Sequence, residues 1–464
     1  MPKPTPLSGF PELLPAQRFV EAEVISTLAE TFELYGFAGI ETRAVEPMDQ
    51  LLRKGETSKE VYVLRRLQDA EAGRDSGIGL HFDLTVPFAR YVLEHAGKLE
   101  FPFRRYQIQK AWRGERPQEG RFREFTQADI DIVGRDELSF HHDIEIARVM
   151  LDALARLADP ESIGLPGLRL QVNNRKLLQG FYTGLGVADP AEAMRLVDKL
   201  DKLSPDALRT QLVEDAGLTP AQADACLHLA TIRTRDDGFV GEVRDLGVRD
   251  ELLDEGLAEL AALVRGCADL VTDRARVEAD LAIARGLDYY TGTVFETRLD
   301  GFESLGSICS GGRYDSLASD GRVRYPGVGI SLGVSRLLVP MLSQGRLAAD
   351  RSVPSAVLVA LVDEESRQAS DAVAAQLRGN GVACEVAASA QKFGRQIRYA
   401  ERRGIPYVLF PGADGSPPEV KDIRSGEQRP VDPATWQPPP ADLRPRVVGQ
   451  GPTQGTTQSE EQPK

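Results

Sequence analysis

The sequence contains no long apolar segment and few cysteines. No stretch approaches the ~18 consecutive apolar residues of a membrane-spanning helix, and the N-terminus has no apolar core of signal-peptide length. The four cysteines, Cys226, Cys267, Cys309 and Cys384, are scattered and form no CxxC pair. This spacing argues against a zinc site and against a disulfide framework. Together these absences predict a cytoplasmic protein.

An excess of positive charge is also missing. The formal net charge of the 464 residues is -14 at pH 7, so the surface as a whole does not attract nucleic acid. Binding RNA would therefore require local basic patches. A hydrophobic content of 42% is sufficient for two or three domains with their own cores.

The segment from Ala111 to Gly134 has the pattern of a strand, a charged loop and a second strand. In the second strand Gln127, Asp129 and Asp131 alternate with apolar residues, so only one face is apolar. Arginine's fixed fork of donors matches phosphate oxygens, which suits a small substrate beside a polyphosphate. An exposed hairpin with weak surface ion pairs fits the same segment. The loop arginines are Arg113, Arg116, Arg121 and Arg123.

Asp83 and Thr85 interrupt an otherwise apolar passage from a strand to a helix. A buried carboxylate costs free energy unless it is paired. These residues either cap the helix predicted to start near Pro87 or bind an ammonium group of a ligand, and both alternatives stay open.

His141, His142 and Glu145 have spacings that a metal site could use. They lie, however, at the predicted start of an exposed helix, with no third ligand type nearby. We therefore predict no metal site here.

Hydrophobic periodicity divides the rest of the chain. It predicts a helix ending at Leu34, strands at 40–44 and 61–67, and mostly helical structure from about 175 to 265. The sheet is predicted to resume at Val277–Ile283. From Ser355, short apolar strands alternate with helices, which predicts a compact α/β domain with a partly parallel sheet.

One helix of this last region concentrates positive charge against the acidic average. Its basic residues form a candidate RNA contact, although a solvated helix face is usually the better explanation of a single charge run. The residues are Lys392, Arg395, Arg398, Arg402 and Arg403.

Three segments combine glycines with arginine or tyrosine: ARGLDYYTGTVFE from Ala284, SICSGGRYDSL from Ser307 and YPGVGISLGVSRLL from Tyr325. Glycines let the backbone approach a ligand closely. The run GVGISLG is not a dinucleotide fingerprint, because its glycine spacing is wrong and no βαβ unit frames it.

Taken together, these segments resemble the histidine–tRNA ligases, a family of class II aminoacyl-tRNA synthetases. The first helix with its YGF strand is similar to class II motif 1, the Arg113 hairpin to motif 2 and GVGISLGVSRLL to motif 3. ARGLDYYTGTVFE and GGRYD are similar to two signatures of the histidine branch. The resemblance covers about residues 8–432. Two departures are Ser335, where the family commonly has glutamate, and Cys309-Ser310 before GGRYD, where a third glycine is common.

The resemblance implies an α+β fold, with a class II antiparallel sheet flanked by helices. The implied catalytic core is 1–174 with 266–345, and a helical insertion spans 175–265. An α/β anticodon-binding domain would span 354–436. The Pro-, Gln-, Gly- and Thr-rich residues 437–464 are expected to be disordered. In the family, motif 1 forms a dimer interface, which implies a homodimer.

The resemblance also implies ATP-dependent ligation of L-histidine to histidine tRNA through a histidyl-adenylate. Mg²⁺ would accompany ATP, with no tightly bound cofactor and no membrane partner. Arg113 would hold the α-phosphate, and Arg285 would contact that phosphate and the histidine carboxylate. The implied ATP contacts are Arg113, Glu115, Arg121 and Arg336.

For histidine, the resemblance assigns the ammonium group to Asp83, Thr85 and Gln127. Asp131 and Tyr290 would read the imidazole ring, with Tyr289 and Tyr314 in the same set. Lys392, Arg395 and Arg398 would contact the anticodon end of the tRNA.

Two other functions are compatible with part of this pattern. A histidine-sensing regulatory subunit of ATP phosphoribosyltransferase shares the core, but typically lacks the C-terminal domain and degrades the motif 2 and RGLDYY arginines, which this chain keeps. A class II ligase for another amino acid is disfavoured by the residues that would read the imidazole.

Overall fold

The computed structural model describes residues 5–52, 60–68, 77–200, 203–284, 289–319, 321–412 and 416–449. The chain divides into two compact units, which are described separately. The first is Met1–Pro11 with Val24–Pro340, and the second is Glu12–Glu23 with Met341–Lys464. Among the described residues, every helix is too short or too polar to cross a membrane.

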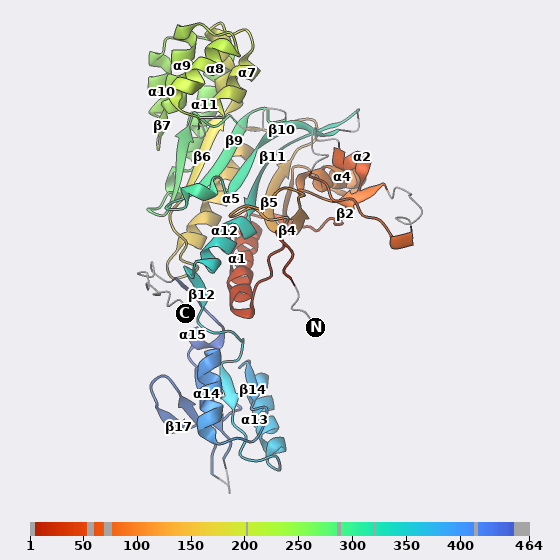
Figure 1. Ribbon diagram of the computed structural model, residues 1–464, viewed down its shortest axis with the longest axis vertical. Helices are drawn as coiled ribbons and strands as arrows, with labels where there is room; N and C mark the ends of the chain where they lie inside the picture. The colour runs from red at the N-terminus through yellow and green to blue at the C-terminus, as the bar shows by residue number, and fades with distance from the viewer. Residues whose placement is uncertain are drawn as a thin grey trace, which may run out of the picture. The chain divides into compact units, whose positions relative to one another are not determined.

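A nine-stranded sheet forms the centre of the first unit (Figure 1). Its order is β1-β4-β5-β11-β10-β9-β6-β8-β7, and neighbours are antiparallel except in the pairs β1–β4 and β6–β8. This confirms the predicted α+β class. The strands are β1 (Ala38–Gly39), β4 (Phe103–Trp112), β5 (Glu124–Val133), β6 (Leu168–Asn174), β7 (Arg233–Thr234), β8 (Ala275–Asp280), β9 (Thr293–Leu299), β10 (Cys309–Ser319) and β11 (Arg324–Gly333).

Helix α5 (His141–Ala158) packs against β5, β6, β8 and β11. Its apolar residues recur every three or four positions, so Ile146, Met150 and Leu154 all become fully buried on one face. Further helices among the described residues before residue 345 are α1 (Pro15–Leu34), α2 (Met48–Leu51), α4 (Thr85–His95) and α12 (Val334–Ser343), with 3-10 turns η3 (Ala96–Lys98), η4 (Ala268–Leu270) and η5 (Glu303–Leu305).

Two predicted strands near the N-terminus were wrong in position or extent. The strand expected at 40–44 is replaced by β1 and by β2 (Val45–Pro47), which pairs with β3 (Ile78–Leu80). The strand expected at 61–67 is reduced to one bridge, Val63 with Gly79. Strand pairing depends on distant partners, so apolar alternation alone does not determine where a strand ends.

Among the described residues six helices lie between β6 and β8, in agreement with the mostly helical structure predicted for this region, and capping residues explain where five of them begin. The side chains of Asn174, Asp189, Ser204, Thr219 and Asp250 each accept a backbone N–H at a helix start. The helices are α6 (Arg175–Gly184), α7 (Pro190–Val197), α8 (Pro205–Glu214), α9 (Pro220–Thr231), α10 (Phe239–Asp245) and α11 (Glu251–Gly266).

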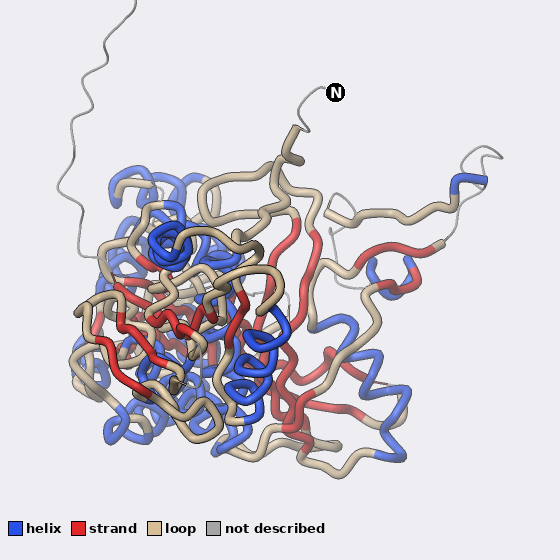
Figure 2. Tube along the Cα trace, turned by 90° about the horizontal axis from the view of Figure 1, so that it is seen from below, coloured by secondary structure: helices blue, strands red, loops and turns tan. Residues whose placement is uncertain are grey.

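The second unit contains a five-stranded sheet of order β14-β13-β15-β16-β17. The first three strands are parallel and the last two close the sheet as an antiparallel hairpin, so the sheet is partly parallel, as predicted. Figure 2 distinguishes its strands from its helices by colour. The elements are β12 (Leu347–Ala349), β13 (Val357–Val359), α13 (Arg367–Gly379), β14 (Cys384–Val386), α14 (Phe393–Arg403), β15 (Tyr407–Phe410), β16 (Glu419–Asp422), β17 (Gln428–Pro430), α15 (Pro440–Leu443) and β18 (Val447–Gly449).

A disordered tail was predicted from residue 437, but this start is too early, because α15 and β18 follow it. Strand β18 pairs with β12, and Asp442 of α15 accepts hydrogen bonds from Arg424 Nη2 at 2.7 Å and from the Tyr407 hydroxyl at 2.8 Å. These partners come from distant segments, so the low apolar content of the tail did not reveal them. Residues 450–464 lie outside the described part of the chain.

Candidate active site

A cavity of about 270 Å³ opens where the β4–β5 hairpin meets β10, β11 and the start of α12. Arg113 and Arg121 line it from the hairpin, and Arg336 lines it from α12. Glu115 lines it as well, so all four predicted ATP-binding residues share one cavity, although the hairpin and α12 lie far apart in the sequence.

The orientation of Arg113 is set by its surroundings. Its Nε donates to the Phe82 carbonyl at 3.0 Å, and its guanidinium lies 5.1 Å from the centre of the Phe125 ring. Arg113 Nη1 lies 3.9 Å from Glu115 Oε1. The side chain is 34% exposed, so the charged group is held at the cavity without being sealed from a ligand.

The other predicted ATP contacts are also anchored. Arg121 Nη1 lies 3.6 Å from Glu115 Oε2 across the hairpin loop. Arg336 Nε donates to the Leu305 carbonyl at 3.1 Å. Because each guanidinium has several donors in a fixed fork, these contacts orient it while other donors face the cavity.

Strands β4, β5 and β11 carry a continuous row of polar side chains beside this cavity. Gln127 Nε2 donates to Ser331 Oγ at 2.7 Å, while its buried Oε1 has no hydrogen-bond partner in the structure. Deeper along β5, Asp131 accepts a hydrogen bond from the Tyr314 hydroxyl at 2.9 Å. The row thus presents acceptors to a ligand with N–H donors.

Glycines make room for these side chains. A Cβ at Gly329 would lie 2.0 Å from Asp131 Oδ1, and one at Gly312 would lie 2.7 Å from the Tyr290 ring. Tyr290 also bonds the Tyr289 hydroxyl at 2.7 Å. Burial first, and then the charges of Tyr289 and Asp131, raise the pKa of Tyr290 well above its ordinary value, so it stays a neutral hydroxyl.

Asp83 and Thr85 lie at the start of α4, where Thr85 is the first residue. Asp83 is 5% exposed, and its Oδ1 accepts the Val86 N–H at 3.0 Å. This bond is the capping interaction of the first alternative. A carboxylate offers about four lone-pair positions, so the bond is compatible with a second role toward a ligand. Arg285 lies outside the described residues.

Two charged residues of this row were not predicted from the sequence, namely Arg105 as a site residue and Asp129 as a buried partner. The alternation of Arg105, Gln107 and Gln109 along β4 was the available signal. Strand pairing places Arg105 opposite Asp131 and Gln107 opposite Asp129.

Asp129 titrates far from its ordinary range. Burial raises its pKa to about 7, with Asp131 and Asp83 adding to the rise, while Arg105 and Ser331 oppose it. A carboxyl with a raised folded-state pKa stabilises the fold below its ordinary pKa near ~4, and this contribution is lost as the pH rises through the folded value.

We therefore expect Asp129→Asn, which mimics the protonated carboxyl, to melt at a higher temperature than the wild type at about pH 8 and to differ less from it at about pH 5. Thermal melts at both pH values measure this. Asp136→Asn, at an exposed position, is the control. A difference between Asp129→Asn and the wild type that does not change with pH would contradict the prediction.

The two departures from the family pattern have structural consequences. Ser335, 6% exposed, accepts the Thr126 N–H on its hydroxyl at 2.8 Å, which ties the start of α12 to β5. Cys309 is buried at the cavity wall, and burial raises the pKa of its thiol to about 12. The thiol is therefore neutral and unreactive at pH 7.

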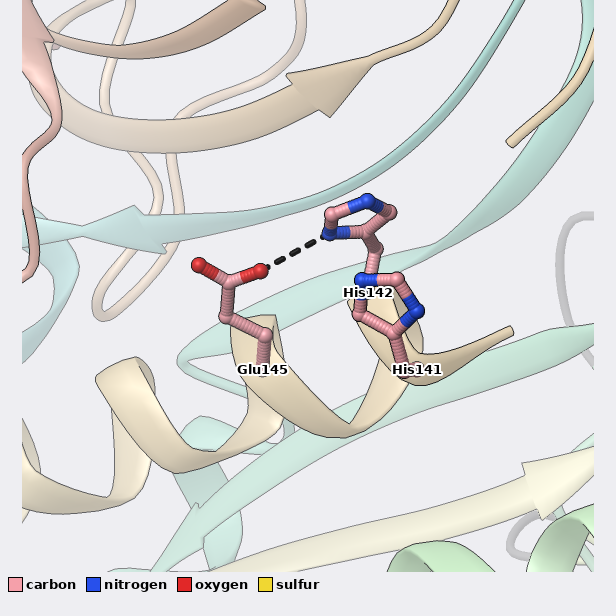
Figure 3. Close-up of side chains that lie close together, drawn as sticks. All are labelled: His141, His142 and Glu145. Carbon is pink, nitrogen blue, oxygen red and sulfur yellow. Dashed lines mark hydrogen bonds and ion pairs between the residues drawn. The ribbon is translucent and has the colours of Figure 1, made fainter. Parts of the chain in front are cut away.

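The His141, His142 and Glu145 cluster lies apart at the start of α5 (Figure 3). His142 Nδ1 and Glu145 Oε2 are 2.8 Å apart. Arg104 also bonds both oxygens of Glu145, at 2.8 and 3.1 Å. Because a guanidinium already neutralises this carboxylate, a metal cation is disfavoured here, and the absence of a metal site stays a prediction.

The second unit has a larger cavity, of about 510 Å³, beside α14. Arg395, Arg398 and Arg402 line it together with Tyr399. Lys392 precedes the first residue of α14 and is not part of the lining. An open cavity with several guanidinium groups and an aromatic ring suits a nucleic-acid segment.

Comparison with known proteins adds a family context. The histidyl-tRNA synthetase family model matches residues 9–337, and the anticodon binding domain model matches residues 356–434. A histidine–tRNA ligase of Cutibacterium acnes is 59% identical over 96% of this chain and 98% of its own length. One of Micrococcus luteus is 57% identical over 97% of this chain and 99% of its own length.

Solved structures agree with this similarity. A crystal structure of histidyl-tRNA synthetase from Nostoc sp. PCC 7120 has a TM-score of 0.82 and 34% identity, and the match covers 93% of this chain and 97% of that one. A protein described as an ATP phosphoribosyltransferase regulatory subunit/histidyl-tRNA synthetase, from Bacillus halodurans C, has a TM-score of 0.69 and 20% identity over 86% of this chain and 97% of that one. The latter likeness concerns the fold alone.

Proposed function

Because this chain belongs to the histidyl-tRNA synthetase family and ligates histidine to tRNA with ATP, we propose that the cavity beside the β4–β5 hairpin performs the chemistry. The observation that carries this assignment is the convergence of Arg113, Arg121 and Arg336 on one cavity beside the acceptors of β5. Histidine-dependent ATP–pyrophosphate exchange, measured with and without tRNA, tests it.

In the first step the histidine carboxylate attacks the α-phosphorus of ATP, and the bond to pyrophosphate breaks. The carboxylate is already ionised at pH 7, so no strong base is needed. The obstacle is the approach of two anions and the charge that develops on the phosphate. Arg113 and Arg285 act on the α-phosphate and Arg336 on the γ-phosphate, so that positioning and charge stabilisation lower the barrier.

Histidine lies along the polar row in this proposal. Its ammonium group meets Asp83, Thr85 and the unpaired Oε1 of Gln127. Its imidazole meets Asp131 and Tyr290, with Tyr289 and Tyr314 supporting them. A site that hydrogen-bonds a substrate N–H rejects analogues without it by about 10⁴–10⁵, which explains selection of histidine.

Mg²⁺ fits the ATP end. Glu115 is the one carboxylate among the described residues that line the cavity. Protein sites for Mg²⁺ with nucleotides commonly use one or two carboxylates with phosphate oxygens and water. Glu115 would hold the ion, which neutralises phosphate charge when bound. The contacts of Glu115 with Arg113 and Arg121, at 3.9 and 3.6 Å, are longer than the two hydrogen bonds by which Arg104 neutralises Glu145.

In the second step the acyl group moves from the adenylate to a ribose hydroxyl at the end of histidine tRNA, and AMP leaves. We assign 1–174 with 266–345 to the catalytic core, 175–265 to the helical insertion and 354–436 to the anticodon-binding domain. The family-model matches at 9–337 and 356–434 support this division. Lys392, Arg395 and Arg398 contact the anticodon end.

Replacing Lys392, Arg395 and Arg398 together with alanine is expected to raise the KM for tRNA by about tenfold, because each lost phosphate contact weakens binding. Pyrophosphate exchange without tRNA should not change. The matched control removes Arg378, Lys421 and Arg429, which carry the same charge in the same domain but do not line its cavity. Equal effects in the two triple variants would contradict the assignment.

The enzyme works as a cytoplasmic homodimer in this proposal. The resemblance of the first helix and its YGF segment to class II motif 1, which forms a dimer interface in the family, supports burial of this region against a second copy. Sedimentation equilibrium tests this, and a monomer at micromolar concentration would refute it.

The regulatory-subunit alternative has less support. The chain retains an anticodon-binding domain, and its relatives of highest identity among those above are histidine–tRNA ligases. If this protein shows no histidine-dependent pyrophosphate exchange, the regulatory-subunit alternative would be favoured instead.

A further inference from the structure

The guanidinium of Arg105 is completely buried under the polar row. Its side chain has 0% exposure, and its Nη2 lies 2.5 Å from Asp131 Oδ2 and 3.9 Å from Asp129 Oδ2. These contacts are ion pairs rather than hydrogen bonds, because neither Nε nor Nη2 of Arg105 makes a hydrogen bond. One face of the guanidinium lies 4.2 Å from the centre of the Phe88 ring. Burying an arginine at this depth is costly unless a specific partner compensates for the lost hydration.

The partner that compensates most directly is Asp131. Strand pairing sets Arg105 of β4 directly opposite Asp131 of β5, so the short contact follows from the register of the hairpin. The Tyr314 hydroxyl holds the other oxygen of the same carboxylate at 2.9 Å. Asp131 is therefore fixed from two sides, by a cation on one oxygen and by a neutral donor on the other.

Arg105 does not itself line the cavity. Asp129 and Asp131 do not line it either, whereas Phe125 and Gln127 of the same strand β5 do. We therefore expect the charge of Arg105 to act on a ligand through the two carboxylates that it contacts. Its Nη1 contact with Gln107 Oε1 is long, at 3.4 Å, and Gln107 in turn donates to Thr42 Oγ1 at 2.9 Å. The β4 side of the row is thus tied to the fold, and on the β5 side Gln127 reaches the cavity.

We propose that Arg105 is a positioning residue that keeps Asp131 ionised and correctly oriented to accept the imidazole N–H of histidine. The inference rests on the proposed role of Asp131 in histidine recognition. Without Arg105, the neighbouring carboxylates of Asp83, Asp129 and Asp131 would face no buried cation from β4, and repulsion would favour proton uptake by Asp131.

The electrostatic surroundings of Asp131 agree with this role. Burial and its neighbouring carboxylates already raise the pKa of Asp129, and Arg105 is the main group that opposes the rise. Among the described residues, the charged and titratable groups that face Asp129 and Asp131 are Arg105, Asp83, Cys309, Tyr289, Tyr290 and Tyr314.

The test compares Arg105→Gln and Arg105→Lys with the wild type in histidine-dependent pyrophosphate exchange. We expect Arg105→Gln to raise the KM for histidine about tenfold, the loss of one charge-assisted contact, with little change in the KM for ATP. As the pH is lowered, the kcat/KM of Arg105→Gln for histidine should begin to fall at a higher pH than that of the wild type, because Asp131 takes up a proton earlier. Arg105→Lys should restore the wild-type pH profile. The histidine substrate titrates identically in all assays, so the difference belongs to the enzyme.

A purely structural role would not move the pH profile. If Arg105→Gln changes the KM values for histidine and ATP alike, or leaves the pH profile where it is, the inference is overturned. Should Arg105→Gln fail to fold, Arg105→Gln with Asp129→Asn removes one cation and one carboxylate together. Its pH profile, compared with that of Asp129→Asn alone, must show the same shift.

Asp131→Asn is measured beside these variants to separate the two proposals. If Asp131→Asn leaves the KM for histidine unchanged, the proposed role of Asp131 fails. If Asp131→Asn raises that KM but Arg105→Gln leaves the pH profile unmoved, only the role of Arg105 fails.

Discussion

Replacement of Arg113 with alanine is expected to lower the kcat of histidine-dependent pyrophosphate exchange by about 10²–10³-fold, the usual cost of removing one donor from developing charge. The Phe82 carbonyl and the Phe125 ring hold this guanidinium at the cavity, so its orientation is established before substrates bind. Pre-orientation makes the loss appear in kcat more than in the KM for histidine. Steady-state exchange assays at varied ATP and histidine measure both constants.

Arg116→Ala is the matched control for this experiment. Arg116 belongs to the same hairpin loop and carries the same charge, but it is exposed and does not line the cavity. We expect it to keep near wild-type exchange. Arg113→Lys should fall between the two, because an ammonium group keeps the charge but cannot bond the Phe82 carbonyl and a phosphate in one plane. Similar losses in the Arg113 and Arg116 alanine variants would show that only the general charge of the loop matters.

Asp131→Asn is expected to raise the KM for histidine by about 100-fold while the KM for ATP changes little, since a lost bond to a charged group in a buried site is worth about 1.5–3 kcal/mol. One oxygen of the Asp131 carboxylate accepts a hydrogen bond from the Tyr314 hydroxyl, and the other oxygen forms an ion pair with Arg105. An asparagine amide has a single oxygen and presents N–H donors at the second position. One of its neighbours, or the imidazole, must then lose its acceptor.

Asp136→Asn provides the comparison for this substitution. Asp136 follows the same strand, is exposed, and has a positive φ of 66° that asparagine tolerates. We expect histidine and ATP constants like those of the wild type. Asp131→Asn with an unchanged KM for histidine would place the imidazole elsewhere in the site.

The hairpin shows how far sequence reasoning reaches. The alternation of polar and apolar residues after Phe125 predicted both strand β5 and the side on which Asp131 lies, because side chains of a strand point alternately to its two faces. The predicted convergence of Arg113 and Arg336 came only from the resemblance to a family, since no local pattern relates a hairpin loop to a helix start that follows β11. The structure places both at one cavity.

Other expectations failed where partners are distant. The tail from 437 was predicted to be disordered from its composition, yet Asp442 is held by Arg424 and Tyr407. Asp83 had two open interpretations, and only the fold shows the bond to the Val86 N–H together with its proximity to Asp129. The composition of a segment says how much apolar surface it can bury, but not which distant group will pair with its charges.

The amino-acid sequence by itself determined the helical insertion, the parallel strands of the second unit and the polar face of β5, because caps and periodic burial act over a few residues. Only the tertiary structure decided that Arg105 lies beneath Asp131 and that Ser335 bonds the Thr126 N–H. These contacts depend on strand register and on segments that meet only in the folded chain. A buried charge takes its pKa and its orientation from such neighbours, so these properties exist only once the sheet has formed.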